Sequence, residues 1–82
     1  MAARGSAGRP HQFGIVIVNI LLNTLEELAA QIVARVLPGG RLVLSGLLAA
    51  QGDAAERAYL ALGLRPLGRK ERQGWIRVEL ER

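Results

Sequence analysis

The chain has no cysteine, and only three of its 82 residues are Phe, Trp or Tyr. The absence of cysteine excludes disulfide bonds, thiolate zinc sites and a cysteine nucleophile. The scarcity of aromatic residues leaves an aliphatic core of Leu, Val, Ile and Ala, which is typical of helices packed on a buried sheet. The most apolar uncharged stretch, residues 13–25, contains Asn, Gly and Thr and is shorter than the about 20 apolar residues of a membrane helix. We therefore expect no membrane partner.

Acidic residues are few, with seven against eleven Lys and Arg, which gives a formal charge of +4. Arg4 and Arg9 supply two of these charges, and the remainder is close to balanced. Lys and Arg are not interleaved with aromatic residues in a stripe, as they are in most nucleic-acid footprints. We interpret the charge as an aid to solubility and predict no direct DNA binding.

The length allows one domain, which we place at residues 13–82. Residues 1–12 are small, polar and free of acids, and this composition predicts a disordered tail. Residues 13–20 form a continuous apolar run, which is typical of a strand buried on both faces. Alternation predicts that Ile15, Ile17 and Asn19 share one face of this strand.

The capping pair Asn23 and Glu26 predicts a helix with an apolar stripe that runs to Leu37. The run Pro38-Gly39-Gly40 is expected to end that helix, since proline cannot continue it and glycine supplies a left-handed turn. A second strand is predicted at residues 41–48. A second helix is predicted to begin at Asp53, with Glu56 three residues later, or a turn earlier.

The last segment predicts two strands joined by a two-residue turn at Gln73-Gly74. The fold class is therefore α/β, with the order β-α-β-α-β-β and a mostly parallel sheet whose final strand is antiparallel. Successive right-handed crossovers place both helices on one face, although the first two strands are apolar on both faces. The other face and the open edge of the first strand therefore call for further protein or for self-association.

The residues of 13–82 resemble the C-terminal half of class I S-adenosylmethionine-dependent methyltransferases, and within these the PrmA family, which methylates ribosomal protein L11. The resemblance rests on Asn19-Ile20-Leu21 at the end of the first strand, the turn at residues 37–42, and Ser45-Gly46-Leu47-Leu48. The resemblance implies the fourth to seventh strands of a Rossmann-like sheet. It also implies S-adenosylmethionine as cofactor, a ribosomal protein as substrate and a cytoplasmic location.

Several marks of the family are absent. The chain has neither the glycine-rich cofactor loop nor the acidic residue that would hold the ribose hydroxyls, and Gly14 stands where the family commonly has an aspartate. In the complete fold, ligands bind where the strand order reverses, between the first and fourth strands. This sequence supplies only the fourth-strand side of that crevice, and we expect the isolated chain to be inactive.

The resemblance also implies roles for five residues. Asn19 is expected to orient the substrate amine and, with Ile20, to contact the cofactor, because an amide offers both an acceptor and a donor. Leu21, Ser45 and Gly46 are expected to line the substrate pocket. Residue type alone favours a different role for Asn19, a local backbone hydrogen bond at a strand end. Ser45 has no histidine near it in sequence, and no metal-binding constellation is predicted.

Three functions remain open at this point. The first is N-methylation of a large-subunit ribosomal protein by an enzyme of which this sequence is a part. The second is a non-enzymatic interaction module that pairs through the open sheet edge. The third is a class I methyltransferase that acts on a small molecule, since the residues quoted above do not distinguish between substrates.

Overall fold

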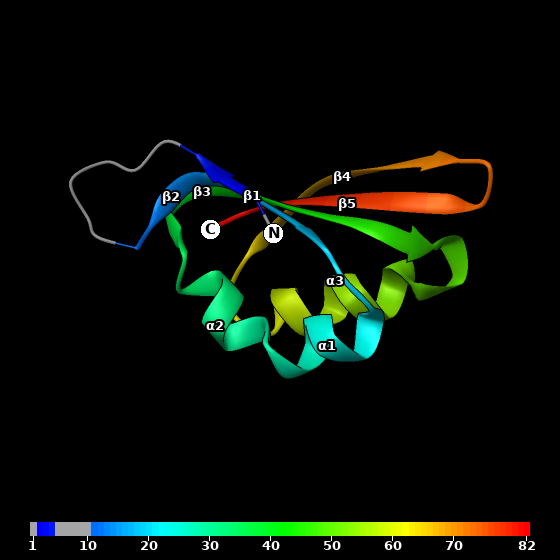
Figure 1. Cartoon of the computed structure of the whole chain (residues 1–82), viewed down its shortest axis with the longest axis horizontal. Helices are drawn as coiled ribbons and strands as arrows, with labels where there is room; N and C mark the ends of the chain where they lie inside the picture. The colour runs from blue at the N-terminus through cyan, green and yellow to red at the C-terminus, as the bar shows by residue number, and fades with distance from the viewer. Residues whose placement is uncertain (1, 5–10) are drawn as a thin grey trace.

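The computed structural model describes the backbone of Ala2–Arg4 and residues 11–82, and these form one sheet with helices on a single face (Figure 1). The strands are β1 (Ala2–Arg4), β2 (Phe13–Asn19), β3 (Val36–Leu48), β4 (Arg65–Arg72) and β5 (Trp75–Glu81). The helices are α1 (Leu22–Glu27), α2 (Ala29–Val33) and α3 (Gly52–Leu60), with a 3-10 turn, η1, at Ala49–Gln51. Of the predicted tail, Ala2–Arg4 pair with β2, while residues 1 and 5–10 lie outside the described residues.

The sheet order is β1-β2-β3-β5-β4. Strands β2 and β3 pair in parallel, whereas β1 with β2, β3 with β5 and β4 with β5 pair antiparallel. The α/β class is confirmed. The expectation of a mostly parallel sheet holds for the directions of β2, β3 and β4, which all run the same way. It does not hold for the pairing, because the antiparallel β5 lies between β3 and β4. That insertion depends on where the final hairpin docks, which its local sequence does not specify.

The first crossover differs from the single helix that the sequence predicted. It consists of α1 and α2, with a break at Leu28, where φ is −97° and ψ is 10°. Leu21, not Asn23, caps α1, and the Asn23 Oδ1 accepts a hydrogen bond from the Thr24 N–H at 3.0 Å. Only two residues, Ile20 and Leu21, separate β2 from α1, so the helix begins before Asn23 is reached.

The Pro38-Gly39-Gly40 run lies inside β3, and not after a helix as predicted. Gly39 has φ +80° and its N–H donates to the Arg82 carbonyl at 2.8 Å, while the Arg82 N–H donates to the Gly40 carbonyl at 2.9 Å. Val36 pairs with Phe13 of β2. Hydrogen bonds to distant segments therefore hold this stretch as a strand, although its spacing of apolar residues fitted a helix.

The second crossover begins before Asp53, in agreement with the second of the two predicted starts, because α3 follows directly on η1. The closing hairpin at Gln73-Gly74 is confirmed. Gln73 has φ +53° and Gly74 has φ +83°, and two successive positive values are typical of a type I′ turn, which suits the twist of a two-residue hairpin.

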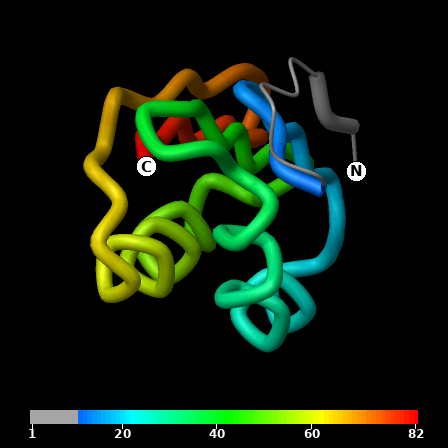
Figure 2. The backbone as a smooth tube through the Cα atoms, turned by 90° about the vertical axis from the view of Figure 1, so that its left-hand side faces the viewer, coloured from blue at the N-terminus to red at the C-terminus, as the bar shows by residue number. Residues whose placement is uncertain are grey.

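The core lies between the sheet and the helices. Val16 and Val18 of β2, and Leu42 and Leu44 of β3, are at most 1% exposed, and Tyr59 of α3 is completely buried. Figures 1 and 2 show from two directions that the helices lie on the same side of the sheet. This confirms the prediction from crossover handedness.

The opposite face of the sheet has no helix over it in the described part of the chain, and Ile15 and Ile17 on that face are 42% and 40% exposed. The sequence predicted an open edge at β2, and this is wrong for the three residues of β2 that pair with β1. The register places Ala2 beside Ile17 and Arg4 beside Ile15, so the chain's own N-terminal segment occupies that edge. The composition of residues 1–12 gave no sign of this strand, because the pairing is satisfied by backbone groups alone.

Candidate functional site

The ends of β2 and β3 bring together three of the five residues expected at the site. The two strands are parallel, so their carboxyl ends meet at one edge of the sheet, and Asn19 pairs in register with Ser45. Gly46 follows Ser45 directly. The sheet thus places an amide, a hydroxyl and an exposed glycine side by side.

A β-bulge shapes the end of β3. Leu44 pairs with Val78 and Leu47 with Ile76, so β3 advances three residues while β5 advances two. Gly46 has φ +75° and supplies the left-handed conformation that such a bulge requires. In the sequence, the Ser45-Gly46 dipeptide is the feature that marks this bulge.

The side chain of Asn19 lies directly over Gly46. A Cβ atom added to Gly46 would be 2.9 Å from the Asn19 Cγ and 3.4 Å from its Nδ2, and closer still to its Oδ1. Glycine therefore allows the amide to lie against the β3 backbone. Restricting the amide in this way lowers the entropy that it loses on binding a ligand.

The hydroxyl of Ser45 holds the two strand ends together. Its Oγ donates to the Val18 carbonyl at 3.5 Å, one residue before Asn19. Ser45 is partly buried while Asn19 is exposed. The serine thus supports the strand end, and the asparagine presents its amide to solvent.

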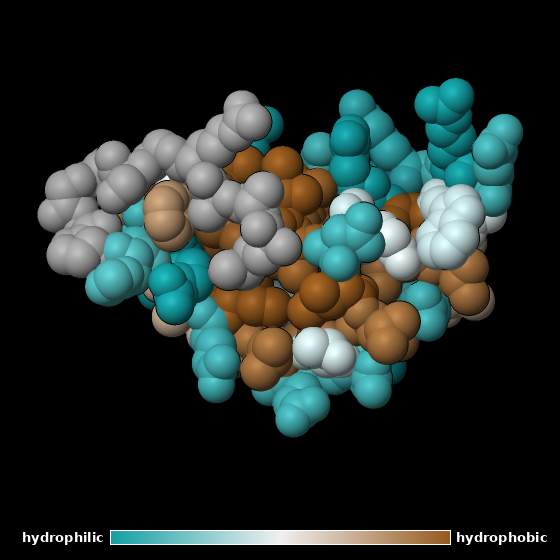
Figure 3. Space-filling view, in the orientation of Figure 1, coloured by the Kyte–Doolittle hydropathy of each residue, from teal (hydrophilic) through white to brown (hydrophobic). Residues whose placement is uncertain are grey.

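Ile20 and Leu21 lie elsewhere. Ile20 lines an apolar groove of about 340 Å³ on the helix side of β2, together with Val18, Thr24, Leu28, Gln31, Ile32 and Arg35. Figure 3 shows apolar side chains at the surface between β2 and the helices. Leu21 is 75% exposed at the start of α1. The structure therefore places Ile20 on the face opposite Asn19, with Leu21 beside the strand end.

Asp53 and Glu56 are engaged in structural contacts. Arg69 of β4 forms ion pairs with Asp53 at 2.8 Å and with Glu56 at 3.0 Å, so both carboxylates hold α3 against the hairpin. The hydrogen bond to Glu56 and then that to Asp53 raise the pKa of Arg69 above its ordinary value. Among residues 11–82, no cluster of three His, Asp or Glu side chains suitable for a metal ion occurs.

A second group of residues lies beside the site and was not recognised from the sequence. Ser45 and Gly46 also line a cleft of about 370 Å³ whose other walls are Lys70, Arg72, Trp75, Ile76 and Arg77. Arg72 pairs with Trp75 and Lys70 with Arg77 across the hairpin. A hairpin register drawn from the predicted Gln73-Gly74 turn would have shown these neighbours.

Comparison with known proteins assigns the family. A family model described as ribosomal protein L11 methyltransferase (PrmA) matches residues 2–82. The chain belongs to the PrmA family. The match begins before Phe13, so it extends beyond the resemblance noted in the sequence and includes the segment that contains β1.

Relatives of this PrmA chain carry the same description. It is 47% identical over 64 residues to the ribosomal protein L11 methyltransferase of Methylococcus capsulatus, covering 78% of this chain and 22% of that protein. It is 41% identical over 69 residues to the enzyme of Brucella suis, covering 84% and 24%. The chain thus spans about a quarter of the length of these relatives.

A solved structure has the same fold. The ribosomal protein L11 methylase of Lactobacillus delbrueckii subsp. bulgaricus superposes with a TM-score of 0.78 at 22% identity, covering 87% of this PrmA chain and 37% of that one. The arrangement of strands and helices is therefore shared. Within the described residues of the PrmA chain, no helix is long and apolar enough to span a membrane.

Proposed function

We propose that this chain forms the substrate-side wall of an S-adenosylmethionine-dependent methyltransferase that methylates an amine of ribosomal protein L11 in the cytoplasm. The observation that carries the proposal is the Asn19 amide, held against Gly46 at the carboxyl ends of two neighbouring parallel strands. Family membership and the names of the relatives support the type of reaction and the substrate.

Asn19 can orient an amine for methyl transfer. Its Oδ1 accepts an N–H of the substrate amine, which directs the nitrogen lone pair away from the amide toward the methyl donor. Such alignment supplies much of the rate of a displacement reaction, and a misplacement of about 1 Å can cost roughly 10²-fold. The bulge at Gly46 and the Ser45–Val18 hydrogen bond fix the position of the strand end that carries the amide.

The residues present fit part of a cofactor site. S-adenosylmethionine, when bound, supplies an electrophilic methyl group. Asn19 offers a polar contact at the end of β2. Ile20 follows it and offers an apolar side chain, which faces the groove on the other side of the strand. The groups expected to hold the rest of the cofactor belong to strands that this sequence does not contain. We therefore expect the 82-residue chain alone to show little or no catalysis.

A chimera tests the role of Asn19. Residues 19–82 of this chain would replace the matching segment of the Methylococcus capsulatus relative, and methyl transfer to ribosomal protein L11 would be measured. We expect transfer by the chimera and a loss of roughly 10²-fold in kcat for Asn19→Ala. Asn23→Ala is the matched control, because Asn23 contacts only the neighbouring Thr24 backbone among the described residues.

The outcome separates positioning from folding. A chimera that folds and transfers methyl groups equally well with Asn19→Ala would refute the assignment of Asn19. Titration of S-adenosylmethionine into the labelled 82-residue chain, followed at the Asn19 side-chain amide, provides a second measurement. We expect no saturation up to millimolar cofactor, and saturation in the micromolar range would show that the chain completes a site by itself.

A second candidate function is self-association through the helix-free face. Ile15 and Ile17 are about two-fifths exposed there, and Ile17 lies beside Val43 in register. Buried apolar area of this kind drives association. Sedimentation over a hundredfold range of concentration tests the candidate, and a single monomeric species at all concentrations would rule it out.

A further inference from the structure

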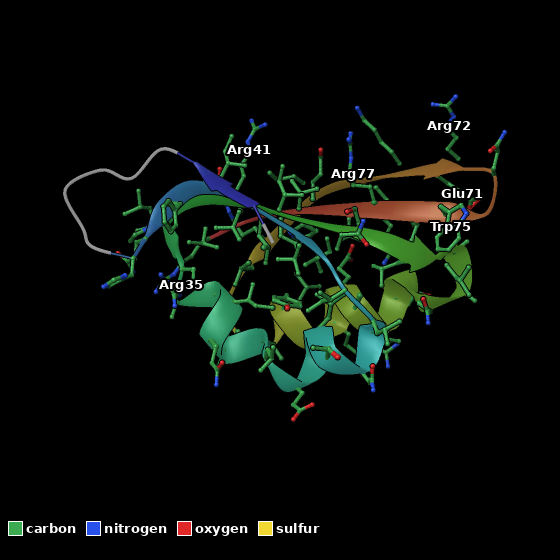
Figure 4. All side chains as sticks on the ribbon, viewed as in Figure 1. Arg35, Arg41, Glu71, Arg72, Trp75 and Arg77 are labelled. Carbon is green, nitrogen blue, oxygen red and sulfur yellow. The ribbon has the colours of Figure 1, made fainter. Side chains whose placement is uncertain are left out.

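The cleft on the β4–β5 hairpin combines cations with an exposed aromatic ring. Lys70, Arg72 and Arg77 provide three positive charges, and no acidic residue lines the cleft in the part of the chain that the structure describes. Its volume of about 370 Å³ lies in the range of small-ligand pockets. Figure 4 shows Arg72 and Arg77 rising from the face of the sheet that faces away from the helices.

Two of these cations have no acidic partner. In the described part of the chain, the ion pairs of the hairpin involve Arg65, Arg69 and Arg77 but neither Lys70 nor Arg72. Arg77 reaches Glu79 at 3.4 Å, yet its Nε is buried without a hydrogen-bond acceptor among the described residues. Lys70 and Arg72 thus offer the cleft donors whose acceptors the described chain does not supply.

Trp75 lies at the same end of the hairpin as Arg72, and its side chain is 54% exposed. A tryptophan that served only to anchor the hairpin would bury most of its ring. Glu71 is near Trp75 in sequence, but strand alternation places it on the opposite face from Lys70 and Arg72. The ring is therefore available to a ligand that contacts the cations.

Protection of a sheet edge accounts for only part of this arrangement. Strand β4 is an edge strand, and Lys and Arg on an edge discourage pairing with other chains. That explanation covers the charges of β4, which is exposed along its whole length. It does not explain the exposed tryptophan, because Trp75 belongs to β5, which is an interior strand of the sheet.

We propose that this cleft binds single-stranded RNA, with phosphates on Lys70, Arg72 and Arg77 and one base stacked on Trp75. Cations that follow a backbone, combined with an aromatic platform, are the general means of holding unpaired nucleic acid. A duplex offers no free base face to the ring, and an acidic peptide uses the charges but leaves the ring unused. The proposal is independent of the methyltransferase assignment, although the cleft shares Ser45 and Gly46 with that site.

Trp75 itself reports binding, because it is the chain's only tryptophan. The experiment titrates an eight-nucleotide oligouridylate into the 82-residue chain at 20 to 200 mM salt and follows tryptophan fluorescence. We expect saturable quenching and a plot of log K against log salt with a slope of about −1.4 to −2.1, since each of two or three neutralised phosphates contributes about −0.7. An RNA duplex and an octaglutamate peptide are titrated in parallel.

Variants separate the two kinds of contact, with fluorescein-labelled oligouridylate and anisotropy as the readout. Trp75→Ala is expected to weaken binding by about 5- to 150-fold, the range for base–aromatic stacking, and Trp75→Phe by less. Lys70→Glu and Arg72→Glu are expected to weaken it more than tenfold and to flatten the salt slope. Arg57→Glu on α3 is the matched control for charge, and circular dichroism checks that each variant folds.

Three results would overturn the proposal. Equal binding of octaglutamate would show a site for acidic peptides, and equal binding of the duplex would show that stacking plays no part. An effect of Arg57→Glu as large as that of Lys70→Glu would show attraction to net charge alone. Asn19→Ala is expected to leave RNA binding unchanged, so failure of the methyl-transfer assignment would not affect this result.

Discussion

Replacing Gly46 with alanine is expected to displace the Asn19 amide and to destabilise the fold. Gly46 has φ +75°, a conformation that costs a residue with a Cβ atom about 1–2 kcal/mol. The new Cβ would also lie 2.9 Å from the Asn19 Cγ. Asn19 is exposed and its side chain is short, so it can rotate away rather than force the strands apart.

The cost of Gly46→Ala has two parts, one from the backbone of residue 46 and one from the displaced Asn19 side chain. Moving Asn19 to a less favoured side-chain conformation adds about 0.5–1.5 kcal/mol to the backbone term. The total is therefore roughly 1.5–3.5 kcal/mol. For a domain of this size, m is about 1 kcal/mol per M of urea, so the midpoint of unfolding should fall by roughly 1.5–3.5 M.

Gly63→Ala provides the matched control. Gly63 has φ +92°, and a Cβ added to it would meet nothing within 4 Å. Its substitution should therefore cost the backbone term alone, about 1–2 kcal/mol. Urea unfolding of both variants, measured by circular dichroism, gives the difference due to Asn19. In the Asn19→Ala background, Gly46→Ala should cost no more than Gly63→Ala.

The Asn19 side-chain amide resonance supplies the decisive readout. We expect it to shift in Gly46→Ala and to stay in place in Gly63→Ala. If Gly46→Ala leaves this resonance unchanged and costs no more than Gly63→Ala, the amide does not lie against Gly46. The geometric basis of the proposed site would then be refuted.

Two further predictions concern stability. The buried Tyr59 hydroxyl donates to the Leu25 carbonyl at 2.9 Å, so Tyr59→Phe is expected to lower the free energy of unfolding by about 1–2 kcal/mol in urea unfolding. Burial raises the pKa of Tyr59 to about 12 from its ordinary 10, so this contribution is complete below pH 10 and is lost as pH rises toward 12. The decline over that range should be smaller in Tyr59→Phe, and an identical pH profile would contradict the assignment. Gln73 has φ +53° in the hairpin turn, so Gln73→Asn is expected to raise the melting temperature, whereas a lower one would argue against a type I′ turn.

The sequence predicted those elements whose cause is local. The continuous apolar run at residues 13–20 indicated a buried strand, and Gln73-Gly74 indicated a hairpin turn, because period and turn chemistry act over a few residues. The helix predicted up to Leu37 was wrong at its end. Val36 in its last turn pairs with Phe13 instead, and the two glycines that follow bond to Arg82. Such distant partners are not visible in a local pattern.

The residues predicted for the candidate site also divide into those that the structure brings together and those that it places elsewhere. Residue type and the family resemblance singled out Asn19, Ser45 and Gly46, and the structure brings these three together. Ile20 was singled out by the same resemblance, but the structure places it in the apolar groove on the other face. The functional role of each of these residues remains a prediction.

By itself, the sequence determined the α/β class, the helix-covered face and the family, because hydrophobic period, crossover handedness and short motifs are properties of the chain as written. Only the tertiary structure decided that β5 lies between β3 and β4 and that the N-terminal segment pairs with β2. It also placed Lys70, Arg77 and Trp75 of the hairpin beside Ser45 and Gly46 of β3, in one cleft. The reason is that strand pairing joins residues through backbone hydrogen bonds, whose partners the identities of neighbouring side chains do not specify.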